Sequence, residues 1–341
     1  MNAIRDEYAV TLLPGGETFL ARAGESVLDA ALRHGIMLPH ECRRGTCGSC
    51  RAECKAGSLE QATLAGSLQS AVVRGGQKLL ACLAVPQDDV VLECVPVEPR
   101  FLPRKLPARV RQITFPADDV AVVHLQLGAG QSFSFRAGHY LNVALPGGPR
   151  RSYSLARPGL DGSVVELELH IRRVPGGAFS NQVFDRLKVR DVVRLEGPYG
   201  HFHLRDDHEG PLIFLATGTG FAPIKAILEE MRLAGDKREV SFYWGGRQLN
   251  DLYLHKWVQE LRATMPRLRY VPVLSRDPDW KGRLGWVQDA ALADCADVRA
   301  VQVYACGSPA MIADAQRQFC FAGLREDNFF ADAFLPTSAV C

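Results

Sequence analysis

Three closely spaced cysteines near the N-terminus constrain this chain more than any other feature. Cys42, Cys47 and Cys50 stand in the run Glu41-Cys-Arg-Arg-Gly-Thr-Cys-Gly-Ser-Cys50, and Cys82 follows at a distance. A C-x4-C-x2-C spacing with a remote fourth cysteine is typical of the ligands of a plant-type [2Fe–2S] cluster. The small residues between the sulfurs tolerate tight turns and let backbone N–H groups point at a cluster. The spacing therefore predicts a metal site with these four cysteines as ligands.

Two alternatives compete with this assignment. A structural zinc site usually shows two C-x2-C pairs, whereas this chain has one such pair, Cys47 and Cys50. Cys54 lies four residues after Cys50 and competes with Cys82 for the fourth ligand position. We favour Cys82 because the plant-type pattern uses a remote cysteine. The apolar segment 79–84 around it also reads as a buried strip that could shield a cluster.

Length and composition place the chain among multidomain globular proteins. Its 341 residues exceed one ordinary domain and predict two or three domains. Hydrophobic residues make up 47% and charged residues 23%, which is the balance of a folded protein. Because the formal net charge is only +2, we expect no nucleic-acid partner.

Cysteine usage favours a reducing compartment, and we expect a cytoplasmic protein. The ten cysteines belong to a long chain in which four are assigned to a metal, and no signal peptide is recognised. The most apolar window, 211–224, is interrupted by glycine and proline and closed by Lys225. It reads as a buried strand and turn, so we expect no membrane partner.

Residues 1–97 read as an α+β unit built around the cluster loop. Alternation of apolar and polar residues over 8–12 and 18–23 predicts two strands. Ser26 is placed to cap a short helix, and 89–94 reads as the last strand. A sheet that grasps one helix suits this order.

A proline-rich stretch follows the first unit. Four prolines fall between residues 96 and 107, a density that favours extended, semi-rigid chain. We therefore predict a linker over 98–107. The basic run from Arg100 to Arg111 is interpreted as the solvated surface of that linker.

The remaining chain divides into a strand-rich part and an alternating part. Residues 98–206 predict an antiparallel β-barrel, since short strands are separated by glycine and proline turns. Its expected strands are 120–127, 140–144, 164–171 and 192–195. Residues 207–341 alternate strand with helix, which predicts a parallel α/β sheet. Its expected strands are 212–216, 240–244, 269–274 and 301–305.

Two motifs mark the ends of the expected parallel strands. Gly218-Thr-Gly-Phe-Ala-Pro223 opens a helix, and its glycines would let the backbone approach a pyrophosphate at the helix N-terminus. The alternative is a tight strand-to-helix turn without a ligand. Cys306-Gly-Ser-Pro309 ends the last parallel strand, where ligands of open α/β sheets bind. Cys306 equally suits a buried small side chain.

Two further motifs lie in the strand-rich part. Arg151-Ser-Tyr-Ser154 offers a charge for phosphate, a flat aromatic face and a hydrogen bond for a ring nitrogen. These are groups that a flavin site could use, and the alternative is the polar face of a strand. Gly176-Gly177-Ala-Phe-Ser180 is a glycine turn.

The order of these motifs closely resembles the ferredoxin–NADP reductase superfamily, in its variant with an N-terminal plant-type ferredoxin domain. The RxYS, GTGxAP and CGSP elements are specific when they occur in this order, and the resemblance extends to Asp332-Ala-Phe334. It implies a β-grasp [2Fe–2S] ferredoxin domain over 1–97, a FAD-binding antiparallel β-barrel over 98–206, and an NAD(P)-binding α/β domain over 207–341.

The resemblance implies roles for single residues in the flavin site. Arg151 would contact the FAD pyrophosphate, Tyr153 the isoalloxazine ring and Ser154 the flavin N5 atom. The other residues that the resemblance places along the flavin are Ser152, His170, Ile171, Arg172, Gly176, Gly177 and Ser180.

The resemblance also implies a dinucleotide site and a catalytic pocket. Cys306 would lie near the hydride-carrying carbon, and Asp332 and Phe334 resemble the C-terminal acidic and aromatic pair of the family. Together with Ser154 they are the expected catalytic residues, although seven residues follow Phe334 here. The residues implied along the dinucleotide are Thr217, Gly218, Thr219, Gly220, Cys306 and Gly307.

The adenosine end of the dinucleotide is expected after the second and third parallel strands. Arg247 follows the second of these strands, and Ser275 and Arg276 follow the third. A Ser-Arg pair resembles a 2′-phosphate site for NADPH, but arginine can also stack on adenine. We favour NADH as the donor, with NADPH as the alternative.

The resemblance implies a reductase that passes electrons from NAD(P)H through FAD and a [2Fe–2S] cluster to a separate protein. Members of this variant serve bacterial ring-hydroxylating oxygenases, and we expect an oxygenase or hydroxylase component as partner. The alternative is a pyridoxamine-dependent dehydratase of deoxysugar synthesis, which CDP-6-deoxy-glucoseen reductases serve. A third reading, from another class, is a non-catalytic protein whose cofactor sites have decayed.

Overall fold

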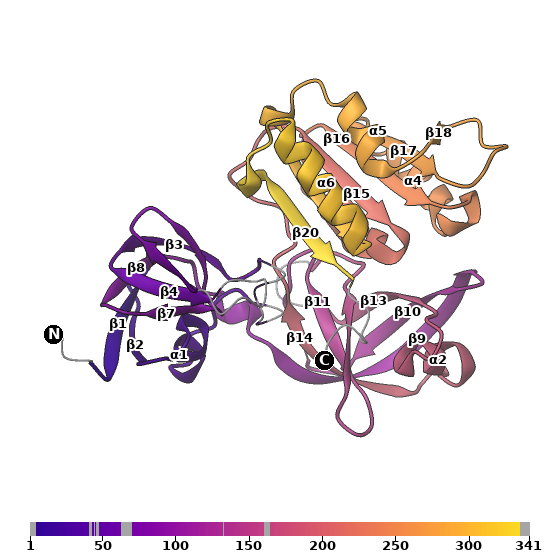
Figure 1. Ribbon diagram of the computed structural model, residues 1–341. Helices are drawn as coiled ribbons and strands as arrows, with labels where there is room; N and C mark the ends of the chain where they lie inside the picture. Colours follow the sequence, from indigo (N-terminus) through magenta and orange to yellow (C-terminus); the bar gives the residue numbers. More distant parts are fainter. Residues whose placement is uncertain are drawn as a thin grey trace. The chain divides into compact units, whose positions relative to one another are not determined.

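The computed structural model describes residues 5–40, 43, 45, 48–62, 70–131, 133–159 and 164–334. They form two compact units. The first comprises Met1–Leu102 with Tyr199–His201, and the second comprises Pro103–Pro198 with Phe202–Cys341. Figure 1 shows the elements of both units in the colours of the sequence.

The first unit is a mixed sheet that covers one helix. Its five-stranded sheet has the order β2-β1-β8-β3-β6, in which β1 runs parallel to β8 and the other described pairs are antiparallel. A smaller sheet has the order β5-β4-β7. Its elements are β1 (Glu7–Leu13), β2 (Thr18–Arg22), α1 (Val27–Arg33), β3 (Arg51–Ala56), β4 (Ser58–Ala62), β5 (Ser70–Arg74), β6 (Lys78–Leu80), β7 (Ala84–Pro86), β8 (Val90–Glu93) and η1 (Pro99–Phe101).

Local chemistry explains why α1 begins where it does. The Ser26 hydroxyl accepts a hydrogen bond from the Asp29 N–H at 3.1 Å, which satisfies one N–H of the first turn. The helix buries Val27, Leu28 and Ala31 against the sheet. The β-grasp fold expected for the N-terminal domain is confirmed.

The second unit begins with an antiparallel barrel. Its strands have the order β12-β11-β14-β9-β10-β13, and a bridge between Leu155 and Leu169 joins the two ends of this sheet. The elements are β9 (Arg104–Ala117), β10 (Val120–Leu127), β11 (Tyr140–Ala144), β12 (Arg150–Ser154), β13 (Glu166–Arg172), α2 (Ala178–Asp185) and β14 (Val192–Tyr199). Side chains of alternating strand residues fill the interior. The expected β-barrel is confirmed.

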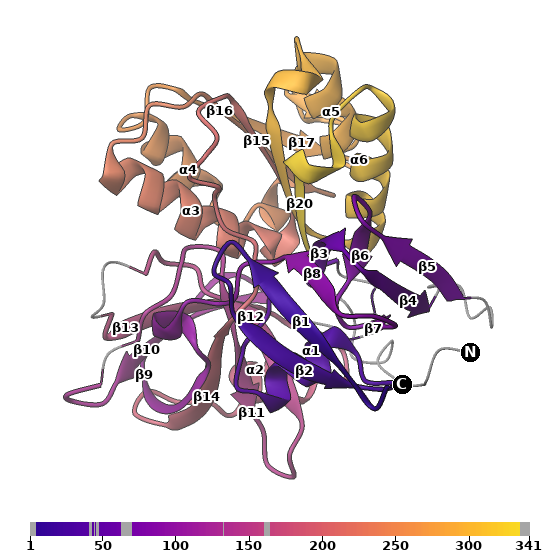
Figure 2. The same cartoon turned by 90° about the vertical axis from the view of Figure 1, so that its left-hand side faces the viewer.

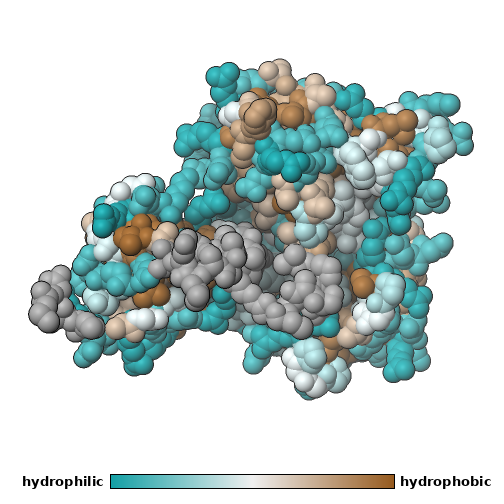
Figure 3. All heavy atoms as spheres, viewed as in Figure 1, coloured by the Kyte–Doolittle hydropathy of each residue, from teal (hydrophilic) through white to brown (hydrophobic). Residues whose placement is uncertain are grey.

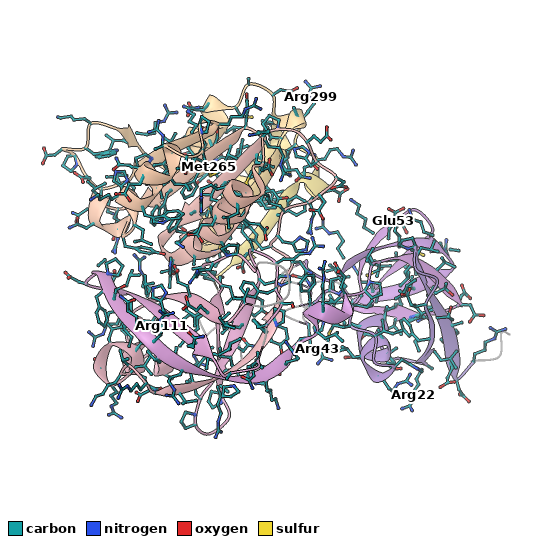
Figure 4. All side chains as sticks on the ribbon, turned by 180° about the vertical axis from the view of Figure 1, so that it is seen from behind. Arg22, Arg43, Glu53, Arg111, Met265 and Arg299 are labelled. Carbon is teal, nitrogen blue, oxygen red and sulfur yellow. The ribbon has the colours of Figure 1, made fainter. Side chains whose placement is uncertain are left out.

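Residues 98–107 do not form the extended linker that we expected. They contain η1 and the start of β9, which pairs with both β10 and β14. Leu106, Ala108 and Val110 are buried at alternating positions, whereas the arginines between and beyond them, such as Arg111, stay exposed. Figure 4 labels Arg111 on the barrel. The alternation of buried and exposed residues therefore predicts the strand better than the prolines predict a linker. Pro107 lies opposite Arg194 in the β9–β14 pairing and does not end the strand.

The second unit continues as a parallel sheet with helices on both faces. The strand order is β18-β17-β16-β15-β19-β20, and every described pair is parallel. The elements are β15 (Leu212–Thr217), η2 (Gly218–Gly220), α3 (Phe221–Ala234), β16 (Val240–Gly246), η3 (Leu249–Asp251), α4 (His255–Arg262), β17 (Leu268–Leu274), β18 (Arg283–Leu284), α5 (Val287–Asp294), η4 (Val298–Ala300), β19 (Gln302–Gly307), α6 (Pro309–Phe321), η5 (Glu326–Asn328) and β20 (Phe329–Ala333).

Alternate residues of the parallel strands face two different cores. Phe214 and Phe242 pack with α3 and α4, whereas Ile213 and Tyr243 pack with α5 and α6. Figure 2 shows the two helix pairs on opposite sides of β15, β16 and β17. This confirms the expected parallel α/β architecture. The domain boundaries at 97 and 206 stay predictions, and the barrel and this sheet form one compact unit.

The outer surface is largely polar on the face seen in Figure 3, where hydrophobic residues occur in scattered patches. Across the described parts of the chain, no helix is both long and apolar enough to cross a bilayer.

Candidate redox site

The carboxyl ends of β15 and β19 approach each other so closely that only glycine fits between them. A Cβ on Gly220 would lie 2.2 Å from the Cys306 carbonyl oxygen, and a Cβ on Gly307 would lie 2.4 Å from Thr217 Oγ1. Gly307 also has a φ of +126°, which side chains disfavour. The Ser308 N–H donates to Thr217 Oγ1 at 2.9 Å and ties the two turns together. The result is a backbone cradle of the kind that binds a pyrophosphate.

Three predicted catalytic residues converge beside this cradle. The Ser154 hydroxyl, at the end of β12, donates to Asp332 Oδ2 over 3.4 Å, and the Cys306 thiol lies 3.8 Å from the same oxygen. Ser154 and Cys306 are buried, and Asp332 is half-buried on β20, opposite Cys306 in the β19–β20 register. The structure thus brings together side chains from the barrel and from both last strands of the parallel sheet.

Phe334, the fourth predicted catalytic residue, follows β20 directly. Its N–H donates to the Gly307 carbonyl at 2.9 Å, so its backbone lies against the cradle. The residue is 36% exposed. The seven residues after Phe334 lie outside the described residues.

β12 carries three further predicted flavin residues, Arg151, Ser152 and Tyr153. Tyr153 is half-buried, its ring lies 5.5 Å from that of Phe179, and burial raises its pKa to about 12. The phenol is therefore neutral and offers an aromatic face. Arg151 is half-buried with its Nη1 donating to the Arg150 carbonyl, and the Ser152 hydroxyl donates to Asn142 Oδ1 at 2.7 Å.

The three side chains of the segment 170–172 lie in different surroundings. The His170 ring is fully buried, and its two nitrogens contact Glu168 and Tyr253. Ile171 is buried in the barrel core. Arg172 pairs with Asp119 at 3.0 Å, yet its Nε and Nη2 are buried without a well-formed hydrogen bond. Its Nη1 would lie 2.7 Å from a Cβ on Gly218, so the guanidinium faces the glycine turn.

The glycine turn before α2 is also closely packed. Gly176 has a φ of +72°, and a Cβ on Gly177 would lie 2.3 Å from Ser180 Oγ. Ser180 Oγ accepts from the Val174 N–H at 3.2 Å, which holds the turn against the first turn of α2. Its position at a helix N-terminus suits a phosphate group.

The residues predicted for adenosine also meet at the carboxyl edge of the sheet. The Ser275 N–H donates to the Gly246 carbonyl at 3.0 Å, and the Arg276 N–H donates to the Arg247 carbonyl at 2.8 Å. Arg247 is exposed and lies 3.5 Å from Asp251 in an ion pair. Arg276 is exposed beside it. This edge therefore presents two guanidinium groups.

Two of the four predicted cluster ligands lie in the described part of the first unit. The sulfurs of Cys50 and Cys82 are 3.2 Å apart, and the Ala81 N–H donates to the Cys50 carbonyl at 2.8 Å. Cys42 and Cys47 lie outside the described residues. Gly45 and Gly48, in the same loop, both have positive φ. Neighbouring thiolates at this spacing fit a shared iron centre.

Cys54, the competing ligand, has different surroundings. It is completely buried in β3, and its thiol lies 3.4 Å from the Ala56 carbonyl oxygen. Burial raises its pKa, which disfavours the thiolate that a metal needs.

A ferredoxin fold joined in one chain to a flavin barrel and a dinucleotide-binding sheet defines the iron–sulfur flavoprotein reductases that draw electrons from NAD(P)H. Family models match all three parts. They describe a 2Fe-2S iron-sulfur cluster binding domain over residues 10–87, an oxidoreductase FAD-binding domain over 107–204 and an oxidoreductase NAD-binding domain over 214–317.

Full-length relatives show the family directly. The CDP-6-deoxy-L-threo-D-glycero-4-hexulose-3-dehydrase reductase of Yersinia pseudotuberculosis is 37% identical over 96% of this chain and 98% of its own length. The reductase component of phenol 2-monooxygenase from a Pseudomonas species is 35% identical over 96% of this chain and 94% of its own. The crystal structure of an Amycolatopsis cytochrome P450 reductase matches with a TM-score of 0.74 and 33% identity, covering 96% of this chain and 99% of that one.

The chain belongs to this family, the ferredoxin–NADP reductase superfamily members with an N-terminal [2Fe–2S] domain. It is an NAD(P)H-dependent oxidoreductase in which electrons pass from NAD(P)H through FAD to the cluster and on to a redox acceptor.

Sequence reasoning missed a buried polar cluster beside the site. Glu168, Lys225 and Tyr253 are buried and contact one another through His170 or directly. One signal was present, because Lys225 directly follows the apolar window 211–224, whereas Glu168 stands at a polar position of an alternating strand, with Glu166 and His170 at the neighbouring polar positions. Charged residues inside apolar runs are rarely buried unless they are paired.

Proposed function

We propose that NADH is the electron donor and that the acceptor is the oxygenase or hydroxylase component of a separate enzyme. The match to a reductase component of phenol 2-monooxygenase over almost the whole chain supports this partner class. The exposed Arg247 and Arg276 suit stacking on adenine, which both dinucleotides share.

The observation that carries the site assignment is the convergence of Ser154, Cys306 and Asp332. When bound, FAD and the cluster convert a two-electron hydride donor into single electrons for the partner. Ser154 donates its hydroxyl proton to Asp332, which would leave its oxygen to accept a hydrogen bond at the position expected for flavin N5. Cys306 supplies a small, soft surface at the end of β19, and Asp332 orients the serine hydroxyl from β20.

The neighbouring residues would hold and orient the cofactors. Arg151 offers its charge to the FAD pyrophosphate, and Tyr153 offers its ring face to the isoalloxazine. The cradle made by the GTG turn and Gly307 would bind the dinucleotide pyrophosphate through backbone N–H groups. In the first unit, Cys50 and Cys82, with Cys42 and Cys47, would bind the cluster.

The experiment that tests this function is anaerobic reduction of a one-electron acceptor, cytochrome c or ferricyanide, driven by NADH. We expect purified protein with stoichiometric FAD, iron and sulfide, and a turnover that requires NADH. Ser154→Ala should slow flavin reduction by NADH without reducing FAD content. Protein that folds correctly but lacks flavin and iron would refute the proposal and favour a decayed, non-catalytic relative.

A second candidate partner is a pyridoxamine-dependent dehydratase of deoxysugar synthesis. The 37% identity to a hexulose-dehydrase reductase over 96% of the chain favours it. NADH consumption that rises with a dehydratase under anaerobic conditions, and not with an oxygenase component in air, would select this candidate.

A further inference from the structure

A buried ammonium group lies where the barrel meets the parallel sheet within the second unit. The side chain of Lys225, on α3, is 6% exposed. Its Nζ donates to the Ala156 carbonyl at 3.0 Å and to Glu229 Oε1 at 2.8 Å, and it pairs with Glu168 Oε1 at 3.2 Å. A charge held this deeply requires such partners, because removing an unpaired ammonium ion from water is strongly unfavourable.

The partners of Lys225 come from different parts of the fold. Glu229 lies one turn further along α3, whereas Glu168 lies on β13 and Ala156 lies two residues beyond β12. The Ala156 N–H also donates to the Glu168 carbonyl at 2.9 Å, so these two barrel segments are already joined. Lys225 therefore connects α3 to the place where β12 and β13 meet.

A second connection reaches the same carboxylate. His170 Nε2 lies 2.7 Å from Glu168 Oε1, and Tyr253 Oη lies 2.7 Å from His170 Nδ1. Because a carboxylate only accepts, Nε2 carries the imidazole proton, and Nδ1 accepts from the tyrosine hydroxyl. Tyr253 lies between η3 and α4, so this chain also runs from the parallel sheet to the barrel.

The charge states of this network are fixed near neutral pH. Burial would raise the pKa of Glu168, but the hydrogen bond from His170 and the charge of Lys225 hold it at about 2. Burial lowers the pKa of His170 and raises that of Tyr253, so both rings are neutral. The network therefore holds a central carboxylate, Glu168, against one ammonium ion, which Glu229 also contacts from the same helix.

The network lies next to the groups proposed for hydride transfer. Ala156 is two residues after Ser154, and Lys225 is five residues after Gly220 of the glycine turn. α3 continues directly from that turn, so Lys225 and the turn belong to one continuous helical segment. The network thus links the strand proposed to bind flavin with the turn proposed to bind the dinucleotide.

We propose that Lys225 is a positioning residue for hydride transfer. It fixes the position of the glycine turn relative to the barrel strand that carries Ser154. This inference rests on the proposed roles of Ser154 and the glycine turn. A misplacement of about 1 Å between reacting groups can lower a rate by about a hundredfold. Lys225 touches neither cofactor in this proposal and acts through Glu168 and Ala156.

The test compares Lys225→Met with Lys256→Met in the full-length holoprotein. Lys256 also pairs with a glutamate four residues on, Glu260, but its side chain is 88% exposed. We expect Lys225→Met to slow single-turnover flavin reduction by NADH at least tenfold, while the KM for NADH changes less than twofold. Lys256→Met should match the unaltered protein in both measurements.

Two further readouts separate positioning from general destabilisation. Lys225→Met should change both quantities by less than twofold. The first is the FAD affinity of the apoprotein, and the second is the rate at which dithionite-reduced protein reduces cytochrome c. The double variant Lys225→Met with Glu168→Gln removes both buried charges of the network. Glu229 also loses its partner in this variant, but its side chain is 20% exposed and is solvated. We expect the double variant to regain thermal stability and still reduce flavin slowly.

Each outcome has a defined meaning. Recovery of fast flavin reduction in the double variant, or an unchanged rate in Lys225→Met, would overturn the positioning role. If Lys225→Met does not fold, Tyr253→Phe replaces it as the test, because this change removes only the hydroxyl donor to His170. A rate of flavin reduction within twofold of normal in Tyr253→Phe would overturn the role of this network. If Ser154→Ala reduces flavin as fast as the unaltered protein, the proposed site itself is refuted. If Ser154→Ala reduces flavin slowly but Lys225→Met reduces it at the normal rate, only the positioning role of Lys225 is refuted.

Discussion

The hydroxyl of Ser154 lies 3.4 Å from the carboxylate of Asp332, although 178 residues separate them in the chain. Ser154 ends a barrel strand, and Asp332 lies on the edge strand of the parallel sheet. Neither fold alone supplies both groups. The hydrogen bond therefore ties the proposed chemistry to the way these two folds join within one compact unit.

Asp332→Asn should slow flavin reduction by NADH by about tenfold to a hundredfold. A hydrogen bond to a charged group is worth about 1.5–3 kcal/mol, and each 1.4 kcal/mol is a factor of ten in rate. Stopped-flow measurement of flavin absorbance under anaerobic conditions gives this rate. Asp314→Asn, on α6, is the matched control, because Asp314 is half-buried and contacts Arg317, Gln288 and Gln318 outside the proposed site. Equal rates in both variants would contradict the role of Asp332.

Cys82→Ser should abolish the visible spectrum of the cluster, whereas Cys54→Ser should keep it. The sulfur of Cys82 lies 3.2 Å from that of Cys50, while Cys54 is completely buried in β3 near the Ala56 carbonyl. Absorbance and iron content of protein purified without air provide the measurement. If only the Cys54 variant loses the absorbance of the cluster, the ligand assignment is reversed.

Arg276→Ala should lower kcat/KM for NADH and NADPH by similar factors. If arginine stacks on adenine, it serves a group that both donors carry. The unaltered protein should prefer NADH, and steady-state assays with both donors measure the preference. A strong preference for NADPH that Arg276→Ala removes would identify a 2′-phosphate site instead.

Gly220→Ala should destabilise the parallel sheet by about 1–3 kcal/mol, the usual cost of forcing extra atoms into a packed site. Its Cβ would lie 2.2 Å from the Cys306 carbonyl oxygen, an atom that cannot move without displacing β19. Thermal unfolding followed by tryptophan fluorescence reports this region, because all four tryptophans lie between residues 244 and 286.

Gly235→Ala is the control for that substitution. Gly235 has a φ of +64°, but a Cβ there meets nothing within 4 Å. Gly235→Ala should lower the free energy of unfolding by about 1 kcal/mol, the cost of a side chain in the left-handed backbone region. It should leave NADH turnover unchanged. Equal loss of turnover in both variants would argue against the cradle.

Acid should reduce the stability difference between the unaltered protein and Glu168→Gln. The folded pKa of Glu168, about 2, lies below its ordinary value of 4.5, so the carboxylate stabilises the fold above pH 4.5. That contribution, roughly 3 kcal/mol at most, is lost as the pH falls from 4.5 toward 2. Urea unfolding followed by tryptophan fluorescence from pH 6 to pH 3 measures the difference. A constant difference over this range would contradict the assignment.

Much of the fold follows from local patterns in the sequence. The strand expected over 140–144 occurs as Tyr140–Ala144, and that expected over 120–127 as Val120–Leu127. Both have clear hydrophobic patterning bounded by turns. Arg104–Ala117 was missed because prolines and arginines obscure its alternation. Its burial depends on pairing with two strands that the local sequence does not reveal.

The candidate site was predictable only in part. The glycine turns carry a recognisable signal, since close backbone approach demands glycine. By contrast, the buried contacts of His170 depend on partners at Glu168 and Tyr253, the second of which is 83 residues away. No periodicity or spacing in the sequence indicates such partners. The sequence predicted only that the segment 170–172 lines the flavin, and the contacts of the His170 ring with protein groups came from the structure.

Asp332 lies on β20, the edge strand of the parallel sheet, so this acid can be separated from the cofactor-binding residues by shortening the chain. A shortened variant that ends before β20 would keep all four predicted cluster cysteines and both glycine turns but lose the acid. Such a variant, if it still binds its cofactors, should accept hydride from NADH more slowly than the unaltered protein. Cofactor content alone is therefore no measure of an intact hydride-transfer site.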